Sequence, residues 1–163
     1  MTLQQIIQQK KWYFVNENLN DTNFPKPEKI QKEGHKIIKM GNSFSSEEAL
    51  ERIKQEGCRP ANAWELAEFA VNHEDEMEQG KVYLAFGQTY RDSGGDHRMP
   101  RVYRYSGGDW EFSLGRFGLD WDVAHCLLAF EDTQALKESS SSLTLEKALE
   151  VVKAAGLEVY KKM

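Results

Sequence analysis

The chain has 163 residues, which is the size of one ordinary domain and enough to bury a core without a metal or disulfide staple. Its formal net charge of −5 at pH 7 excludes broad binding to the phosphate backbone of a nucleic acid, because such binding needs many spare cations. No apolar run reaches the roughly 18 residues of a membrane span, and residues 1–11 lack the apolar core of a secretory signal, so we expect a cytoplasmic protein with no membrane partner.

The first forty residues predict a short helix followed by two short strands. Leu3, Ile6 and Ile7 form a weak apolar stripe within 2–11, which indicates the helix. The β-prone runs 12–15 and 35–40 predict the strands, and the stretch between them contains several Asn, Asp and Pro residues, which is typical of a loop.

Two longer helices follow, and each begins at a capping box. Ser45 with Glu48, and Asn62 with Glu65, pair a short polar side chain with a glutamate three residues later, so each side chain can bond the other residue's backbone N–H group. Gly57 suits the end of the first helix, because glycine adopts the left-handed conformation there at little cost. The apolar residues after each cap recur at helical spacing, which predicts that both helices pack against a sheet.

The segment after residue 80 predicts that sheet. Strands are expected over 81–86, 102–105, 110–117 and 123–130, and the turn 106–109 makes a hairpin of the second and third. Trp110, Phe112 and Leu114 alternate with polar residues, which is the period-2 pattern of a strand with one buried face. We therefore expect an α+β domain in which two helices pack on a mostly antiparallel, loop-rich sheet.

Residues 1–138 are expected to form this single α+β domain, with its core over about 41–131. The serines at 139–142 are typical of a flexible linker, and 143–163 predict an appended C-terminal helix followed by a short strand. If this attachment makes the functional contact, the chain is a structural or assembly subunit.

The segment 81–130 differs from the rest of the chain in composition. It holds ten of the eighteen aromatic residues, seven of the twelve glycines and five of the seven arginines, whereas no lysine occurs over 82–136. Arginine provides planar bidentate hydrogen bonding, and glycine together with tyrosine, tryptophan and arginine is typical of adaptable recognition surfaces. An aromatic β-core with tight turns explains the same composition, so both interpretations stay open.

We expect a non-catalytic ligand- or protein-binding module as the leading function, with its surface in residues 87–125. The ligand-binding residues predicted there are Tyr90, Arg91, Asp92, Tyr103, Trp110, Arg116, Asp120 and Trp121. The rings would supply stacking area, while arginine and aspartate would supply oriented hydrogen bonds to a protein or small-molecule ligand.

A small enzyme is the alternative, because the loop around residue 95 carries possible divalent-metal ligands in Asp92, Asp96 and His97. The spacing matches no EF-hand and no zinc-binding helix, and Asx turns account for aspartates in such loops without a metal. Cys58 and Cys126 belong to no C-x-x-C pair, so we expect buried thiols rather than a zinc or redox site, and no cofactor. No catalytic residue is assigned, and an enzyme is the less favoured interpretation.

The stretch 57–70, with the sequence GCRPANAWELAEFA, resembles the glycine–arginine–proline turn and following helix of formylglycine-generating-enzyme-like domains. Those domains belong to the C-type-lectin-like folds, and the downstream order of GDW at 108–110, a glycine-rich β segment and a final apolar strand is also similar. The motifs RDSGGD at 91–96 and FGLDW at 117–121 are similar to segments of small bacterial proteins. The resemblance implies a C-type-lectin-like fold. It implies no oxidase activity, because the catalytic cysteine pair of the true enzymes does not map onto Cys58 and Cys126.

Overall fold

Side-chain caps determine where the helices begin in the structure, a computed structural model that describes residues 1–132. Its helices are α1 (Leu3–Ile7), α2 (Ser46–Gln55), α3 (Ala63–Asn72) and the 3-10 helix η1 (Glu74–Glu76). Both predicted capping boxes are confirmed, and a third, formed by Thr2 and Gln5, starts α1. At Asn62 the side-chain oxygen accepts a hydrogen bond from the Glu65 backbone N–H at 2.8 Å, and the Glu65 carboxylate accepts one from the Asn62 N–H at 3.1 Å.

The strands confirm the predicted sheet and add elements that the sequence did not indicate. They are β1 (Phe14–Val15), β2 (His35–Lys39), β3 (Cys58–Pro60), β4 (Lys81–Leu84), β5 (Tyr90–Arg91), β6 (His97–Arg104), β7 (Trp110–Arg116) and β8 (His125–Glu131). β3 was not predicted, and β5 with the first half of β6 forms a hairpin where a loop was expected. The α+β class is therefore confirmed, with an open sheet of eight strands and three α-helices in residues 1–132.

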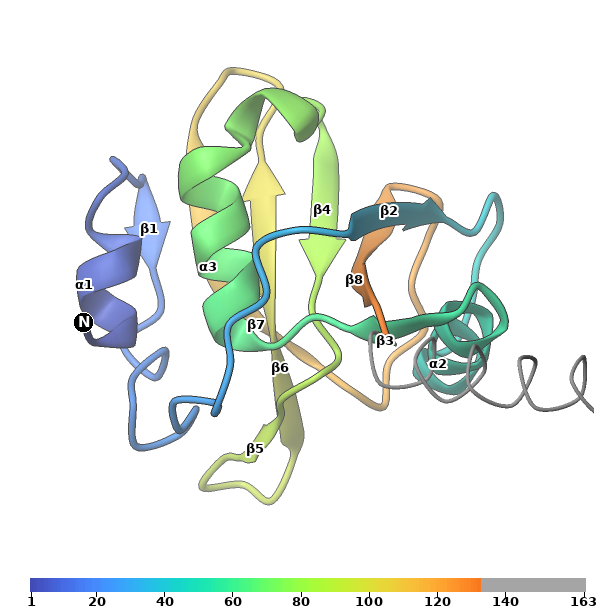
Figure 1. The fold of residues 1–163 in the computed structure, drawn as a ribbon, viewed down its shortest axis with the longest axis horizontal. Helices are drawn as coiled ribbons and strands as arrows, with labels where there is room; N and C mark the ends of the chain where they lie inside the picture. Colours follow the sequence, from blue (N-terminus) through green and yellow to red (C-terminus); the bar gives the residue numbers. More distant parts are fainter. Residues whose placement is uncertain (133–163) are drawn as a thin grey trace, which may run out of the picture. The chain divides into compact units, whose positions relative to one another are not determined.

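The strands follow the order β1-β7-β6-β4-β8-β2, and β5 pairs with β6. Among the described pairings, β1–β7 and β4–β8 are parallel and the other five are antiparallel. β4 pairs with the first half of β8, β3 pairs with its second half, and β2 runs along the opposite edge. β4 and β3 therefore share one side of β8 and meet near its middle. α3 begins shortly after the end of β3 (Figure 1).

The two predicted helices lie on opposite faces of this sheet. α3 and α1 cover one face, over a buried cluster that includes Trp64, Tyr83 and Phe112. α2 packs on the other face, at the side of β3 and β8, over a second cluster that includes Ile53 and Leu127 (Figure 1). Cys126 is buried in the first cluster and Cys58 in the second, so the two thiols lie on different faces.

Two further expectations concern a membrane span and the C-terminal segment of the chain. No helix within residues 1–132 is long and apolar enough to cross a membrane. The serine-rich linker at 139–142 and the C-terminal attachment at 143–163 lie outside the described residues.

Gly87 occupies the point where β4 and β3 converge on β8. Its N–H donates to the Ala61 carbonyl at 2.7 Å, and Ala61 in turn donates to the Leu128 carbonyl at 3.0 Å. A Cβ on Gly87 would lie 2.6 Å from the Ala61 oxygen and 2.7 Å from the Pro60 oxygen. Both atoms are backbone, so no side chain can rotate away to make room, and only glycine fits.

We predict that Gly87→Ala lowers the free energy of unfolding by about 3 kcal/mol, because the added methyl group must push the β3–α3 connection away from β8. Gly107→Ala is the matched control, since a Cβ there meets no atom within 4 Å, and its stability should change by less than about 0.5 kcal/mol. Urea unfolding followed by far-UV circular dichroism measures both variants. Equal stabilities of the two variants would contradict the close approach at Gly87.

Candidate functional site

The two tryptophans among the predicted ligand-binding residues are buried on opposite faces of the sheet. Trp110 lies at the start of β7, in the cluster under α1 and α3. Trp121 lies in the β7–β8 loop, in the cluster under α2, where its Nε1 donates to Oγ of Ser46 at 3.1 Å. The structure therefore does not bring these two rings into one exposed surface.

The two predicted tyrosines also make contacts within the protein. Tyr90 in β5 packs against Phe24, with the ring centroids 5.4 Å apart. Tyr103 in β6 stacks on Tyr105, with centroids 4.1 Å apart, on the sheet face that carries α2. Both predicted tyrosines are half-buried, so each ring has only part of its surface available to a ligand.

Most of the predicted polar residues gather where β5, β6 and β7 meet, at the end of the sheet next to the β5–β6 turn. β5 pairs Arg91 with His97, and β7 pairs Arg116 with Arg98. We call this group the arginine end; it comprises Arg91, Asp92, Asp96, His97, Arg98 and Arg116. Asp120 lies nearby in sequence, in the β7–β8 loop, and is exposed.

Asp92 organises the β5–β6 turn. Its Oδ1 accepts hydrogen bonds from the backbone N–H groups of Gly94 and Asp96, both at 2.9 Å, and its Oδ2 accepts one from Nε of Arg98 at 2.7 Å. The Arg98 guanidinium and these backbone donors hold the pKa of the Asp92 carboxyl below its ordinary value. Both oxygens of Asp92 are thus used by the turn, and the charge of Arg98 is balanced by it.

Two other arginines of this group keep most of their donors available. Arg91 is exposed and donates to the Gly95 carbonyl at 3.2 Å and to Nε2 of His97 at 3.0 Å. Because a guanidinium can only donate, Nε2 of His97 is the acceptor of this hydrogen bond. The side chain of Arg116 is 54% exposed, and its Nε lies 3.6 Å from Oδ2 of Asp96, which is an ion pair beyond hydrogen-bond length.

A cavity of about 420 Å³ adjoins these groups. Asp96, His97 and Arg116 line its polar side, and Phe117 and Leu119 line its apolar side. Leu119 is 50% exposed, which is unusual for a leucine in this part of the chain. The cavity therefore combines an arginine, an imidazole and an apolar wall, which is the mixture expected of a small recognition site.

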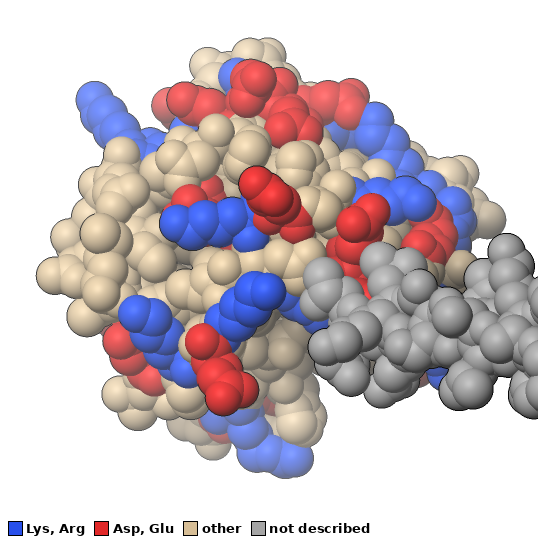
Figure 2. Space-filling model, viewed as in Figure 1, with Lys and Arg blue, Asp and Glu red and all other residues tan. Residues whose placement is uncertain are grey.

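Two further properties bear on what the arginine end could bind: the placement of possible metal ligands and the distribution of surface charge. Within residues 1–132, including Asp92, Asp96 and His97, no group of three or more His, Cys, Asp or Glu side chains is placed to hold a metal ion. Acidic and basic side chains are interspersed over the face shown in Figure 2. Any recognition here therefore depends on individual side chains.

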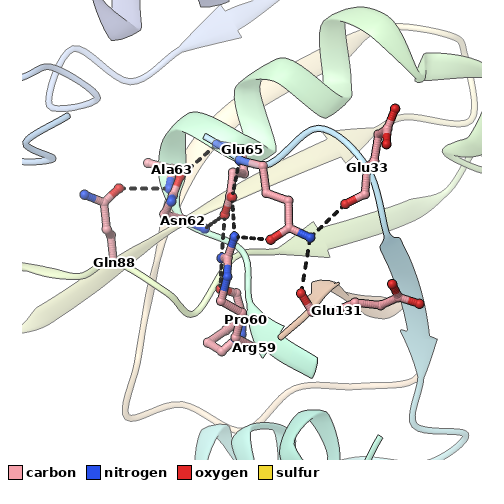
Figure 3. A network of polar contacts seen from close by, with 9 residues as sticks. Glu33, Arg59, Pro60, Asn62, Ala63, Glu65, Gln88 and Glu131 are labelled. Atoms are coloured by element: carbon pink, nitrogen blue, oxygen red, sulfur yellow. Dashed lines mark hydrogen bonds and ion pairs between the residues drawn. The ribbon is translucent and has the colours of Figure 1, made fainter. Parts of the chain in front are cut away.

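The turn that carries the family resemblance forms a buried polar network at the start of α3 (Figure 3). The Glu65 side chain is 0% exposed, and its carboxylate accepts two hydrogen bonds from Arg59, at 2.6 and 2.9 Å. The same carboxylate accepts the backbone N–H of Gln31 at 2.8 Å. The Gln31 amide donates to the Glu131 carbonyl at 3.2 Å and accepts from Arg59 at 3.0 Å.

The first residues of α3 use their remaining donors within the same network. The Ala63 N–H donates to Oε1 of Gln88 at 3.0 Å (Figure 3). Gln88 donates in turn to the Pro25 carbonyl at 2.8 Å. Together with the Asn62 cap, these bonds satisfy the helix start from side chains of the chain itself. The arginine of this turn therefore supports the fold.

The sequence did not indicate Arg98 or Glu65 as partners of the predicted residues. Arg98 was part of the arginine count, but its pairing with Asp92 depends on a hairpin that was expected to be a loop. Glu65 was assigned to a capping box, which accounts for only one of the hydrogen bonds that its carboxylate accepts. The sequence signal that could have indicated the pairing of Glu65 with Arg59 was an arginine next to Pro60, just before a capped helix.

Comparison with known proteins gives no match to this chain: no family model matches it, and no curated protein or solved structure is significantly similar. The geometry of the chain is therefore the basis for assigning a function.

We predict that Glu65→Gln lowers the free energy of unfolding by about 2–4 kcal/mol, because an amide in place of the carboxylate leaves a buried donor of Arg59 or Gln31 unpaired. Glu68→Gln is the matched control on the same helix, since within residues 1–132 the only cation paired with Glu68 is the exposed Lys32, at 3.8 Å. Thermal and urea unfolding measure both variants. The prediction fails if both variants lose the same small amount of stability.

Proposed function

We propose that the chain is a non-catalytic binding module and that the arginine end is its recognition surface. The observation that carries the proposal is the state of the two outer arginines. Both are exposed: Arg116 lines the cavity and its ion pair with Asp96 is 3.6 Å long, Arg91 lies on the lining residue His97, and only Arg98 is paired closely with a carboxylate, that of Asp92. Of the three arginines in the arginine end, Arg98 thus stabilises the turn, and Arg91 and Arg116 remain available to a ligand.

The chemistry of these groups favours a ligand with a carboxylate or phosphate group. Each guanidinium offers planar, paired N–H donors that match the two oxygens of such an anion. The turn also holds Arg91 in place, because its bonds to the Gly95 carbonyl and the His97 ring restrict its rotamers. A donor that is held in advance loses less conformational entropy when the ligand arrives.

The apolar wall adds a second requirement on the ligand. Leu119 and Phe117 are the apolar side chains in the lining of the cavity. An anion that carries a small apolar group would bury the exposed part of Leu119 while its oxygens reach Arg116. The resemblance to C-type-lectin-like domains supports a recognition role of this kind, because that fold family includes many binding modules.

We predict that inorganic phosphate binds at the arginine end and that the double substitution Arg91→Gln and Arg116→Gln weakens this binding by about tenfold or more, because two charge-assisted hydrogen-bond donors are removed. Amide NMR shifts of residues 94–98 and 116–119 report the titration, which is repeated with acetate to compare the two anions. Sodium chloride at equal ionic strength removes the general effect of salt.

Arg52→Gln provides the matched control. Arg52 is a half-exposed arginine of α2 that pairs with Glu56 and does not line the cavity. This variant should bind phosphate as the unchanged chain does. The proposal fails if the unchanged chain shows no shifts at these residues, or if the folded double variant shows the same affinity.

A further inference from the structure

A larger cavity lies at the opposite end of β6 and β7, next to the turn that joins these strands. Its volume is about 750 Å³, within the range of small-molecule sites. It lies between the segment that joins α1 to β1, the end of α3 with η1, and the β6–β7 turn. We call it the tryptophan cleft; the lining residues that matter here are Lys10, Lys11, Trp12, Glu74, Asp109 and Trp110.

Two indole rings form the apolar part of the cleft and are held in place by the fold. Trp12 and Trp110 meet edge to face, with centroids 6.2 Å apart and ring planes at 81°. Nε1 of Trp12 donates to the Ile7 carbonyl at the end of α1, at 2.7 Å. Trp110 is held within the sheet, and the Arg104 guanidinium lies 4.9 Å from its ring. The rings are therefore set before any ligand binds.

A cation from the chain itself already occupies this arrangement. Nζ of Lys10 lies 3.7 Å from the centroid of the Trp110 ring and 5.9 Å from that of Trp12, and it forms an ion pair with the Glu74 carboxylate. The Lys10 side chain is only 9% exposed. An ammonium group against two aromatic rings and a carboxylate is the arrangement by which aromatic cages bind organic cations.

The charge of the cleft fits a cationic ligand in place of Lys10. Lys10 and Lys11 balance Glu74 and Asp109 along the lining. Asp109 is exposed and forms no ion pair with any residue of the described region, so it remains available to a second positive group. If the Lys10 ammonium swings out, the remaining charged lining residues Lys11, Glu74 and Asp109 sum to one negative charge, which a cation can balance. The Arg104 guanidinium on Trp110 lies outside this lining and donates to the backbone carbonyls of Glu74 and Met77.

Lys10 is also placed so that it can leave. It follows the end of α1 in a segment without regular structure, where its backbone N–H donates to the Ile7 carbonyl at 3.2 Å. The side chain can rotate about its own single bonds without moving that backbone. The cost of opening is the loss of the ion pair with Glu74 and of the contact with Trp110, both of which a bound cation would replace.

We infer that the tryptophan cleft is a binding site for a small organic cation with a methylated ammonium group, and that Lys10 closes the site until such a ligand displaces it. A methylated ammonium is less strongly hydrated than the Lys10 ammonium, so it loses less on entering the cleft and covers more of both rings. This site is separate from the arginine end, which lies at the other end of the same strands and takes the opposite charge.

The test uses tetramethylammonium chloride as the probe and compares Lys10→Met with Lys11→Met in the full chain. Lys10→Met removes the internal cation and keeps a flexible apolar side chain, whereas Lys11→Met removes the neighbouring charge, which has no ion pair with a described residue. The indole N–H signals of Trp12 and Trp110 in NMR spectra report binding, with sodium chloride as the salt control.

Lys10→Met should bind the probe about tenfold more tightly than the unchanged chain, because the ligand no longer displaces an internal cation–π and ion-pair contact. Lys11→Met should bind the probe less than about threefold more tightly than the unchanged chain, because it removes an exposed, water-screened lining charge and no contact that the ligand displaces. Adding Glu74→Gln to Lys10→Met should weaken binding again, because the carboxylate that faces the cation is lost. A folded Lys10→Met variant whose indole signals do not respond to the probe overturns the inference.

The unchanged chain gives a second measurement that does not depend on how well the variant folds. Nζ of Lys10 lies 3.7 Å from the Trp110 ring centroid, so the methylene group bonded to Nζ is also close to the ring. The ring current of Trp110 should therefore shift the NMR signals of these methylene protons away from the values of an exposed lysine. Tetramethylammonium, but not sodium at equal concentration, should move these signals towards the values of an exposed lysine. Signals that stay unchanged at saturating probe overturn the displacement of Lys10. Neither outcome bears on phosphate binding at the arginine end, so the two proposals fail independently.

Discussion

The buried carboxylate of Glu65 is the interaction on which the rest of the structure depends. It accepts hydrogen bonds from Nη1 and Nη2 of Arg59 and from two backbone N–H groups, and it has no access to water that could replace any of them. Because these donors come from β3, the start of α3 and the loop before β2, one charge joins three segments that are distant in sequence. Gln31 extends the network to the end of β8.

This constraint positions the β6–β7 hairpin, which carries both proposed sites. α3 starts at the Glu65 network and runs over the sheet face that Trp110 and Phe112 occupy (Figure 1). β4, whose end is fixed against Ala61 at Gly87, pairs with β6 and so holds the hairpin to the β8 side of the sheet. The arginine end and the tryptophan cleft are therefore separated by the length of two paired strands and cannot merge into one surface.

The helix starts and the inward faces of the strands could be predicted from the sequence because both depend on residues close together in the chain. The Ser45 and Asn62 caps and the alternation of Trp110, Phe112 and Leu114 are of this kind. β3 could not be predicted, since three residues that include a proline become a strand only by pairing with β8. The same holds for the parallel partners of β4 and β1, which lie far away in sequence.

Of the candidate site, the exposed arginines could be predicted from the sequence, but the burial of the tryptophans could not. Aromatic residues serve cores and recognition surfaces equally well, so their number near Trp110 and Trp121 could not show that both rings are buried. The cations are more informative, because their two types suit different tasks. Arginine keeps its donors in one plane, so an exposed arginine such as Arg91 or Arg116 can bind an oxyanion without rearranging these donors.

A lysine, with a compact charge on a flexible stem, can instead cover an indole ring and retract from it. No lysine occurs within 82–136, and the one that lies on Trp110 comes from the segment before β1. The ring and the cation that closes over it are thus supplied by different parts of the chain. This arrangement allows Lys10 to move without disturbing the hairpin that holds Trp110.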